Sequence, residues 1–336
     1  MHEFDLPLRH TFTISRESVS VQKTFIVELE EADQKGYGEA TTNRYYGATT
    51  DSMRKSLEGV RTLIESTSLT STSPEELWTQ VHSSLTDDPF AQCALDQAAN
   101  DLWGKLQGKS LMDLWQLSPK NVPASCFTIG IDSIDNMVAK LDEMPGWPIY
   151  KIKLGTNEDV RIIRQLRKQT DAVFRVDANC GWQVDETLRN AETLAELGVE
   201  FIEQPLAADN WSGHQTLFEQ SKLPILADES CIVEDDIERC AGNFHGVNIK
   251  LVKCGGLTPA RRMIREAKEL GMSVMVGCMT ESTVGISAIA QLLPLLDYVD
   301  MDGAALLSKD IATGSHLEKG VCKFSSLAGS GITLHR

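Results

Sequence analysis

From residue 123 onward the chain alternates between short strand-like runs and longer helical stretches, and this repeat limits the possible folds more than any other feature. The runs are rich in β-branched residues and begin near positions 124, 149, 173, 199, 224, 246, 273 and 298. Amphipathic segments between them include residues 157–170, 185–198, 258–271 and 282–295. Each helix returns the chain to the start of the next strand, so the strands are expected to run parallel. Eight such strands at even spacing favour a closed barrel of the TIM type.

An open parallel sheet that binds a dinucleotide is the main alternative architecture. Such a sheet usually carries a Gly-x-Gly-x-x-Gly motif at the turn after its first strand, where the backbone approaches a pyrophosphate closely. No motif of this kind follows the first strand here. The sequence therefore favours the barrel and disfavours a nicotinamide-dependent enzyme.

The first 116 residues have a different pattern. Residues 23–30 alternate between apolar and polar as in a half-buried strand, and the turn sequence at 33–36 predicts a hairpin. Residues 50–66 and 73–85 have helical spacing, and a third, strongly periodic helix is expected from Pro89 to about Gly108. Strands followed by helices indicate a small α+β domain.

The charge balance argues against several classes of partner. The chain has 48 Asp and Glu residues against 32 Lys and Arg residues, which gives a formal net charge of −16. Nucleic acids and anionic membrane surfaces require a basic face, so neither is expected as a partner.

The sequence also bears on where the protein is located. No apolar stretch approaches the roughly 20 residues that span a bilayer, and the first residues do not resemble a signal peptide. Eight cysteines without a Cys-x-x-Cys pair suit a reducing compartment, so we expect a soluble cytoplasmic protein.

Charged residues interrupt the apolar runs at the carboxyl ends of most predicted strands. In a barrel of this type the active site lies at that end. Because a buried charge without a partner costs several kcal/mol, these residues are expected to face one another in a shared polar pocket. They are Lys151, Lys153, Asp177, Glu203, Asp228, Lys250, Asp300 and Asp302.

Three carboxylates, Asp177, Glu203 and Asp228, lie on successive predicted strands. Strands that follow one another in sequence are neighbours in a barrel, so the three side chains should converge. Like charges at close range raise each other's pKa unless a cation lies between them. Oxygen ligands suit Mg²⁺ better than zinc, which prefers His and Cys. We therefore expect a magnesium site; the alternative is that one or more of these carboxylates caps a helix or lies solvated in a loop.

The lysines have a spacing that suits proton transfer. Lys151 and Lys153 share one face of a strand because side chains alternate along it. Two neighbouring ammonium groups lower each other's pKa, and a lysine must be neutral to act as a base. Lys250 lies four strands further on, across the barrel mouth, so a lysine on each side of the metal can serve the two faces of one carbon. The alternative is that these lysines only form ion pairs, and Lys253, an odd step from Lys250, is expected to face outward.

Taken together, the Lys-x-Lys, Asp, Glu, Asp and Lys residues on consecutive strands resemble the enolase superfamily, and within it the muconate-lactonizing subgroup. Its members pair a Lys or His base with Mg²⁺. The resemblance extends over essentially the whole chain and implies an α/β fold, a (β/α)7β modified TIM barrel with an N-terminal α+β capping domain. It implies a capping domain at residues 1–116, a barrel with the active site at 117–308, and a segment at 309–336 that returns to the capping domain.

Asp300-Met301-Asp302 resembles the Asp-x-Asp of dipeptide epimerases, in which the pair holds the α-ammonium group of the substrate. The alternative for this pair is a loop cap. The resemblance implies 1,1-proton transfer at the α-carbon of the C-terminal residue of a dipeptide, with Mg²⁺ on the three carboxylates. Lys153 and Lys250 would be the acid–base pair, and Lys151 would tune Lys153 and contact the substrate carboxylate.

Other residues also match that family. The resemblance implies that Asn179 and Gln204 orient the metal ligands from behind. The segments that contain Thr128, Cys278 and Met279 are similar to family segments, and these residues are expected to contact the dipeptide.

Arg16 occupies the place where family members that epimerise L-Ala-D/L-Glu can carry an arginine for the glutamate side chain. Arg9 and Arg44 are rivals for this role, and a solvated Arg16 is the alternative. The expected substrate is therefore L-Ala-L-Glu or L-Ala-D-Glu, which would imply murein peptide recycling.

Other activities stay open. They are epimerisation of hydrophobic or cationic dipeptides, o-succinylbenzoate synthase activity and N-acylamino acid racemase activity. Substrates of the last two, and of muconate cycloisomerisation, lack an ammonium group for Asp300 and Asp302. A non-catalytic binding protein would be expected to have lost a lysine or a ligand, and none is missing. The sequence leaves homo-oligomerisation open.

Overall fold

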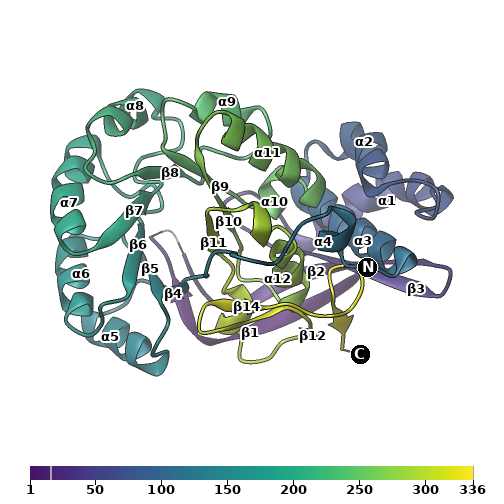
Figure 1. The fold of residues 1–336 in the computed structure, drawn as a ribbon, viewed down its shortest axis with the longest axis horizontal. Helices are drawn as coiled ribbons and strands as arrows, with labels where there is room; N and C mark the ends of the chain where they lie inside the picture. Colours follow the sequence, from purple (N-terminus) through teal and green to yellow (C-terminus); the bar gives the residue numbers. More distant parts are fainter. Residues whose placement is uncertain (16, 336) are drawn as a thin grey trace.

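The computed structural model describes residues 1–15 and 17–335. It combines an eight-stranded parallel barrel with a three-stranded antiparallel sheet and its helices (Figure 1). The barrel helices within residues 134–220 lie on the left of Figure 1, and the first helices of the chain lie on the right. The expected α/β fold, a parallel barrel preceded by an α+β domain, is confirmed. Within the described residues, no helix combines the length and apolar character needed to cross a bilayer.

The N-terminal sheet is a continuous antiparallel meander. Its strands pair in chain order and are β1 (His2–Thr13), β2 (Ser18–Glu31) and β3 (Gln34–Thr41). Ala32 and Asp33 form the turn between β2 and β3 with φ angles of 48° and 60°. Two positive φ angles in a two-residue turn match the right-handed twist of a hairpin, which explains the tight connection.

Three helices follow the sheet, and each begins at a side chain that caps it; the first and third pack on the sheet, and the second packs on those two helices. They are α1 (Thr50–Ser66), α2 (Pro74–Leu85) and α3 (Pro89–Gln107). The capping side chains Thr49, Ser73 and Asp88 each accept a hydrogen bond from a backbone N–H of the first turn. Such caps satisfy donors that the helix itself leaves unpaired. A short helix, α4 (Leu111–Leu114), then leads into the barrel.

Helix α3 lies unusually close to β3, and two glycines make this possible. A Cβ atom at Gly38 would lie 2.1 Å from the carbonyl oxygen of Ala94, and one at Gly36 would lie 2.4 Å from that of Ala98. Any side chain at these positions would therefore push the helix away from the sheet.

The barrel strands follow one another around the ring in chain order. They are β4 (Phe127–Ile129), β5 (Ile149–Lys153), β6 (Val173–Asp177), β7 (Val199–Glu203), β8 (Ile225–Ala227), β9 (Gly246–Ile249), β10 (Ser273–Gly277) and β11 (Tyr298–Asp300). The ring closes just before β4, where Ser125 forms a parallel bridge with Val299 and its Oγ accepts the N–H of Met301 at 3.0 Å. Phe201, Leu226 and Met275, each in the middle of its strand, form a buried cluster that fills the interior. The barrel is therefore a packed core and not a pore.

Helices connect successive strands on the outside of the barrel (Figure 1). They are α5 (Ile134–Glu143), α6 (Asp159–Arg167), α7 (Val184–Glu196), α8 (Trp211–Gln220), α9 (Asp236–Cys240), α11 (Leu257–Glu269) and α12 (Thr283–Ala290), with the short α10 (Leu251–Cys254) before α11. The helix expected over 282–295 is shorter than predicted. It ends at Ala290 and a 3-10 turn, η1 (Leu293–Leu295), follows. Pro294 lies in that turn and cannot donate the N–H that a continued α-helix requires.

Buried hydrogen bonds join the N-terminal domain to the barrel. In each of them, a group at the start of a barrel helix donates to a carboxylate of the N-terminal domain. Glu39 on β3 accepts from the backbone N–H and hydroxyl of Ser282 and from the N–H of Gly285, all at the start of α12. Asp96 on α3 accepts in the same way from Thr258 on α11.

The end of the chain lies against both parts. A second 3-10 turn, η2 (Gly303–Leu306), follows β11, and four short strands come after it: β12 (Ala312–Thr313), β13 (His316–Glu318), β14 (Val321–Lys323) and β15 (Thr333–Leu334). Leu307 forms a bridge with Leu8 on β1, and the N–H of Ser330 donates to Asp101 on α3. These contacts tie the C-terminal segment to the N-terminal domain.

The close approach of α3 to β3 predicts that Gly38→Ala destabilises the protein by at least about 2 kcal/mol, because the new methyl group would overlap the Ala94 carbonyl. Gly59→Ala is the matched control. Gly59 is exposed in α1 with no atom near its Cβ position, so its replacement should stabilise by about 0.5–1 kcal/mol. Urea unfolding followed by circular dichroism measures both changes. Equal stability of the two variants would contradict the expectation.

Candidate active site

Three carboxylates meet at the carboxyl ends of neighbouring strands. Asp177 and Glu203 are the last residues of β6 and β7, and Asp228 follows β8 directly. All three side chains are buried, and one oxygen from each lies within 4.8 Å of the others. The structure therefore brings together the three residues that the sequence predicted as metal ligands.

Lysines contact this carboxylate cluster from two sides. Lys153 on β5 lies 2.6 Å from Asp177 through its Nζ, and Lys250 after β9 lies 2.8 Å from Asp228. Strands β5 and β9 are four positions apart in the ring of eight, so these lysines approach from opposite sides of the mouth. Lys151 is more deeply buried, and its Nζ lies 2.7 Å from both Glu203 and Asp300.

Burial and neighbouring charges act in opposite directions on the carboxylates. Burial, reinforced by the charges of Asp177 and Asp228, raises the pKa of Glu203 to about 7. Burial also acts to raise the pKa of Asp177, but Lys153 and Lys151 outweigh it and hold that pKa below its ordinary value. The cluster therefore combines ionised carboxylates with one that titrates near neutrality.

The lysine pKa values differ from the sequence-based expectation. Burial acts to lower the pKa of Lys151, but the charges of Asp300, Glu203 and Asp177 raise it well above its ordinary value. The pKa of Lys250 is also raised, because Asp228 outweighs burial. The expected lowering by a neighbouring ammonium group is wrong in direction for Lys151, since three carboxylates outweigh one lysine.

The donor atoms of the cluster fit a hard divalent cation. The three residues offer only carboxylate oxygens, the ligand type that Mg²⁺ prefers. One oxygen of Glu203 accepts from Asn248 Nδ2 at 2.8 Å, whereas its other oxygen, Oε2, is buried without a hydrogen bond and lies 2.7 Å from Lys151 Nζ. A buried carboxylate oxygen of this kind is available as a ligand, so the residues present fit Mg²⁺.

Hydrogen bonds connect Asn179 and Gln204 to the segments that carry the carboxylates of the cluster. The N–H of Asn179 donates to Asp177 Oδ1 at 2.9 Å, and the side-chain oxygen of Gln204 accepts from the N–H groups of Asp228 and Ser230. Both residues have positive φ angles, 44° and 35°, which are unfavourable for non-glycine residues. Strain of this kind persists where surrounding contacts enforce it, and here those contacts hold the loops that carry the ligands.

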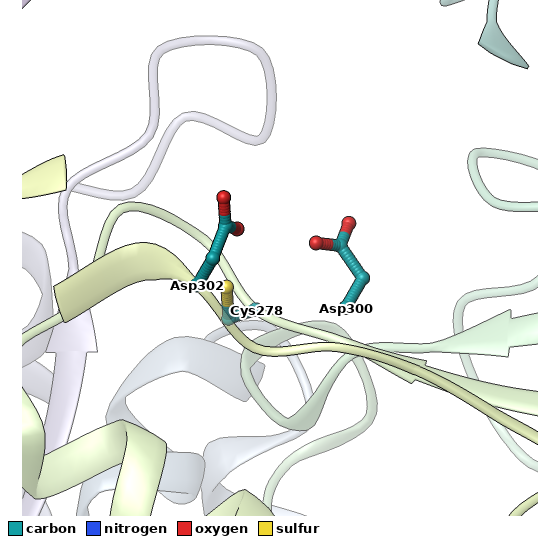
Figure 2. A group of neighbouring side chains, drawn as sticks. All are labelled: Cys278, Asp300 and Asp302. Atoms are coloured by element: carbon teal, nitrogen blue, oxygen red, sulfur yellow. The ribbon is translucent and has the colours of Figure 1, made fainter. Parts of the chain in front are cut away.

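A second acidic pair, which Figure 2 shows, is linked to the cluster by Lys151, whose Nζ contacts both Asp300 and Glu203. The carboxylates of Asp300 and Asp302 project to the same side of the chain, with the sulfur of Cys278 within 4.8 Å of an oxygen of each. Asp300 ends β11, whereas Asp302 lies beyond the strand, before η2. Asp302 accepts from the N–H of Thr128 at 2.6 Å and from its hydroxyl at 3.2 Å.

The two members of this acidic pair carry different charge states. Burial and the charge of Asp300 raise the pKa of Asp302 to about 8. Burial also acts to raise the pKa of Asp300, but the adjacent Lys151 lowers it below its ordinary value. Burial raises the pKa of the Cys278 thiol well above its ordinary value, so that the thiol is neutral at pH 7.

A cavity of about 420 Å³ lies between the two parts of the chain and reaches the reactive groups. Lys153, Lys250, Asp228, Asn179, Cys278 and Met279 line it from the barrel side. The N-terminal domain contributes both apolar or aromatic and polar or charged side chains: Phe12, Ile14, Val19, Val21, Tyr45 and Tyr46, with Gln22, Thr41, Thr42, Asn43, Lys23, Arg44 and Glu17. The cavity therefore joins a polar floor to a roof of mixed apolar, polar and charged side chains.

The three arginines considered as partners of the substrate side chain differ in where they lie. Arg16 lies outside the described residues. Arg44 lines the cavity, whereas Arg9 donates from Nε to the carbonyl of Leu307 and lines a neighbouring cavity with Thr128. Among the described candidates, Arg44 is thus the one that borders the reactive groups.

Two residues of the site were missed or misplaced by the sequence analysis. Lys253 was expected to face outward, but it is fully buried, and its Nζ lies 2.7 Å from Asp228. The error arose because the chain leaves β9 at Lys250 and enters the helical turn α10, where the alternation of a strand no longer applies. Asn248, which donates to Glu203, was overlooked although it shares a strand face with Lys250.

A closed parallel barrel with converging carboxylates, and with lysines on either side of them, is the arrangement of metal-dependent barrel enzymes that transfer protons. Residues 136–336 match the family described as enolase C-terminal domain-like. Residues 3–115 match the N-terminal domain of the mandelate racemase / muconate lactonizing enzyme family. The chain belongs to the enolase superfamily.

Similar proteins cover nearly the full length of the chain. An L-Ala-D/L-amino acid epimerase from Flavobacterium johnsoniae is 57% identical, with 99% of this chain and 98% of the relative aligned. One from Maribacter sp. is 56% identical over 100% of this chain and 99% of the relative. Among solved structures, a dipeptide epimerase from Methylococcus capsulatus complexed with Mg and L-Arg-D-Lys is 31% identical, with a TM-score of 0.90 and coverage of 98% and 97%.

The pKa of Glu203 leads to a prediction about metal binding. Below pH 7 most of the free protein should carry a proton on Glu203, and a divalent cation must displace it. The apparent affinity for Mg²⁺ or Mn²⁺ should therefore fall as the pH drops below 7, by up to about tenfold per unit, and level off above pH 8. Isothermal titration calorimetry across this range measures the effect.

Two variants complete this test. Glu203→Gln removes the titrating group and should give weaker binding with a flatter pH dependence. Glu269→Gln, at the exposed end of α11, removes a carboxylate far from the site and should behave as wild type. Wild-type affinity that stays constant from about pH 6 to pH 8 would contradict the assigned pKa.

Proposed function

We propose that this protein is a Mg²⁺-dependent dipeptide epimerase that inverts the α-carbon of the C-terminal residue of L-Ala-X dipeptides. The observation that carries the proposal is the placement of Lys153 and Lys250 on opposite sides of one carboxylate cluster, with Asp300 and Asp302 beside it. The names of the two relatives above 50% identity support the same activity.

The reaction needs two proton carriers and one site of charge stabilisation. Mg²⁺ held by Asp177, Glu203 and Asp228 would stabilise the negative charge that develops on the substrate carboxylate. One lysine, neutral at that moment, takes the α-proton and breaks the C–H bond. The ammonium group of the other lysine donates a proton to the opposite face of the same carbon, and the reverse reaction exchanges their roles.

The acidic pair is proposed to select the substrate by its free amino group. An α-ammonium between Asp300 and Asp302 would complete a charge-assisted contact that an N-acylated substrate cannot make. Thr128 holds Asp302 in place through two hydrogen bonds. Cys278 is drawn next to Asp302 in Figure 2, and its sulfur lies within 4.8 Å of an oxygen of each carboxylate. This favours a dipeptide over an N-acylamino acid or a succinylbenzoate precursor.

The residue at the C-terminal position of the dipeptide would occupy the cavity under the N-terminal domain. Its lining mixes apolar, polar and charged side chains, and Lys23 and Arg44 supply positive charge for a glutamate beside the carboxylate of Glu17. We propose L-Ala-L-Glu and L-Ala-D-Glu as substrates, with Arg16 as a further contact and Met279 on the barrel side. In a bacterial cytoplasm this activity would serve murein peptide recycling.

Deuterium exchange tests the proposal. Incubation in D₂O with Mg²⁺ should introduce deuterium at the α-carbon of the C-terminal residue, detected by mass spectrometry, with L-Ala-L-Glu among the best substrates. Preference for hydrophobic or cationic dipeptides would keep the reaction and change its specificity. Exchange with N-succinyl amino acids and with no dipeptide would replace the proposed activity.

The opposed lysines predict a stereochemical split. Lys153→Ala and Lys250→Ala should each lower epimerisation by about 10²–10⁴-fold, because each removes one of the two proton carriers. Each variant should still exchange the α-proton of one epimer, and the two variants should retain opposite epimers. Separate measurements on L-Ala-L-Glu and L-Ala-D-Glu in D₂O check this. Retention of the same epimer by both variants would show that the lysines do not act on opposite faces.

The acidic pair predicts a substrate-binding defect. Asp302→Asn keeps the shape of the side chain but cannot lose a proton to become a carboxylate when an ammonium group binds beside it, so KM for L-Ala-L-Glu should rise about tenfold or more. Inhibition by N-acetyl-L-Ala-L-Glu, which carries no ammonium group, should change little. Steady-state kinetics and inhibition constants measure both quantities. A parallel loss for both compounds would assign Asp302 a structural role instead.

A further inference from the structure

Lys253 is a buried charged side chain that the proposed reaction does not use, and it touches one of the proposed metal ligands. Its side chain is fully buried. Its Nζ donates to Asp228 Oδ1 at 2.7 Å, to the carbonyl of Cys231 at 2.7 Å and to that of Asn248 at 3.3 Å, and it also contacts the carbonyl of Asp228. These oxygens belong to the loop after β8 and to the end of β9, so one ammonium group links that loop to the neighbouring strand.

The local chain path explains how Lys253 reaches this position. The turn α10 begins directly after Lys250, and the N–H of Lys253 donates to the carbonyl of Lys250 at 3.0 Å. Gly255 and Gly256, with φ angles of 95° and 120°, end the turn at once. The short turn therefore folds the side chain of Lys253 back beneath Asp228 instead of toward the surface.

A comparison of the two lysine–carboxylate pairs points to the purpose of this contact. Lys153 binds Asp177 Oδ2, and the other oxygen of Asp177 accepts from a backbone N–H, that of Asn179. Lys250 binds Asp228 Oδ2, and the other oxygen of Asp228 accepts from Lys253. Each proposed base thus faces a carboxylate whose second oxygen is fixed by another donor, and on the Lys250 side that donor is charged.

Stability alone does not explain why a buried ion pair occupies this position. Removing an ammonium group from water costs several kcal/mol, and apolar side chains of similar volume often replace buried ion pairs without loss of stability. A methionine or leucine could supply neither the hydrogen bonds to the surrounding carbonyls nor the contact with Asp228. A neutral donor could serve the carbonyls, whereas the contact with the Asp228 carboxylate is the one that uses the positive charge.

We propose that Lys253 is a positioning residue that fixes the carboxylate of Asp228 for both the divalent cation and Lys250. The inference rests on the proposed function and deepens it by assigning a supporting group to one of the two proton carriers. Without Lys253, Asp228 can rotate about its side chain, and within residues 1–15 and 17–335 Lys250 is the one cationic side chain left in an ion pair with it. Cation binding and the proton transfer at Lys250 then weaken together, whereas Lys153 keeps its own fixed partner.

Metal binding gives a readout that does not depend on turnover. Lys253→Met keeps the length of the side chain and removes its charge, so the Kd for Mn²⁺ should rise about 10-fold to 100-fold, the usual effect of removing a group that orients a metal ligand. Lys253→Gln retains a hydrogen-bond donor and serves if the methionine variant does not fold, as judged by circular dichroism. Lys268→Met removes a half-exposed lysine far from the cluster and should leave the Kd unchanged.

The stereochemistry of exchange separates positioning from general damage. At saturating Mg²⁺ in D₂O, Lys253→Met should slow exchange of the epimer that depends on Lys250 at least about tenfold more than exchange of the other epimer. Lys250→Ala identifies which epimer that is. A wild-type Mn²⁺ affinity, or an equal loss for both epimers, overturns the proposal. If the wild-type protein exchanges no dipeptide, the proposed function fails, while the Mn²⁺ titration still decides whether Lys253 positions Asp228.

Discussion

Three buried carboxylates within 4.8 Å of one another can coexist only beside matching positive charge, and the rest of the barrel mouth is built around that constraint. Two like charges 4 Å apart repel by about 4 kcal/mol even at an effective dielectric constant of 20. Lys151, Lys153, Lys250 and Lys253 each contact at least one member of the cluster. The same attraction that permits burial of the carboxylates also delivers lysines to both sides of them, so charge balance and catalytic geometry have a common origin.

The barrel and the N-terminal domain divide the work of the site. Strand ends of the barrel supply the carboxylate and lysine cluster, whereas β1, β2 and the segment after β3 supply most of the apolar side chains of the cavity. The two are held in register by Glu39, which caps α12 just after the loop with Met279. Asn43 also donates to the sulfur of Met279 from the N-terminal side. Substitutions in the roof can therefore change which side chain fits while the charged floor stays intact.

Much of this arrangement could be predicted from the sequence because buried parallel strands leave few places for charge. The positions of Asp177, Glu203 and Lys250 at strand ends were informative because charged residues are rare in such runs. Lys253 could not be placed, since the rule that relates spacing to direction changes where β9 becomes α10. The hydrogen bond from Thr128 to Asp302 forms only when the ring of strands closes, and residue spacing along the chain does not predict that contact.

The order of the strands has a consequence for how the protein acquires its site during folding. Asp177, Glu203 and Asp228 come from consecutive strands, so contacts short in sequence can assemble the carboxylate cluster in a partly built sheet. The contact of Lys151 with Asp300 spans 149 residues and that of Thr128 with Asp302 spans 174, and both require the seam beside Ser125 to close. Contacts between such distant residues form slowly because a long loop must first lose its freedom. The carboxylate cluster can thus form before Asp300 and Asp302 gain their partners, and the proposed contact with the substrate's ammonium group depends on the completed ring.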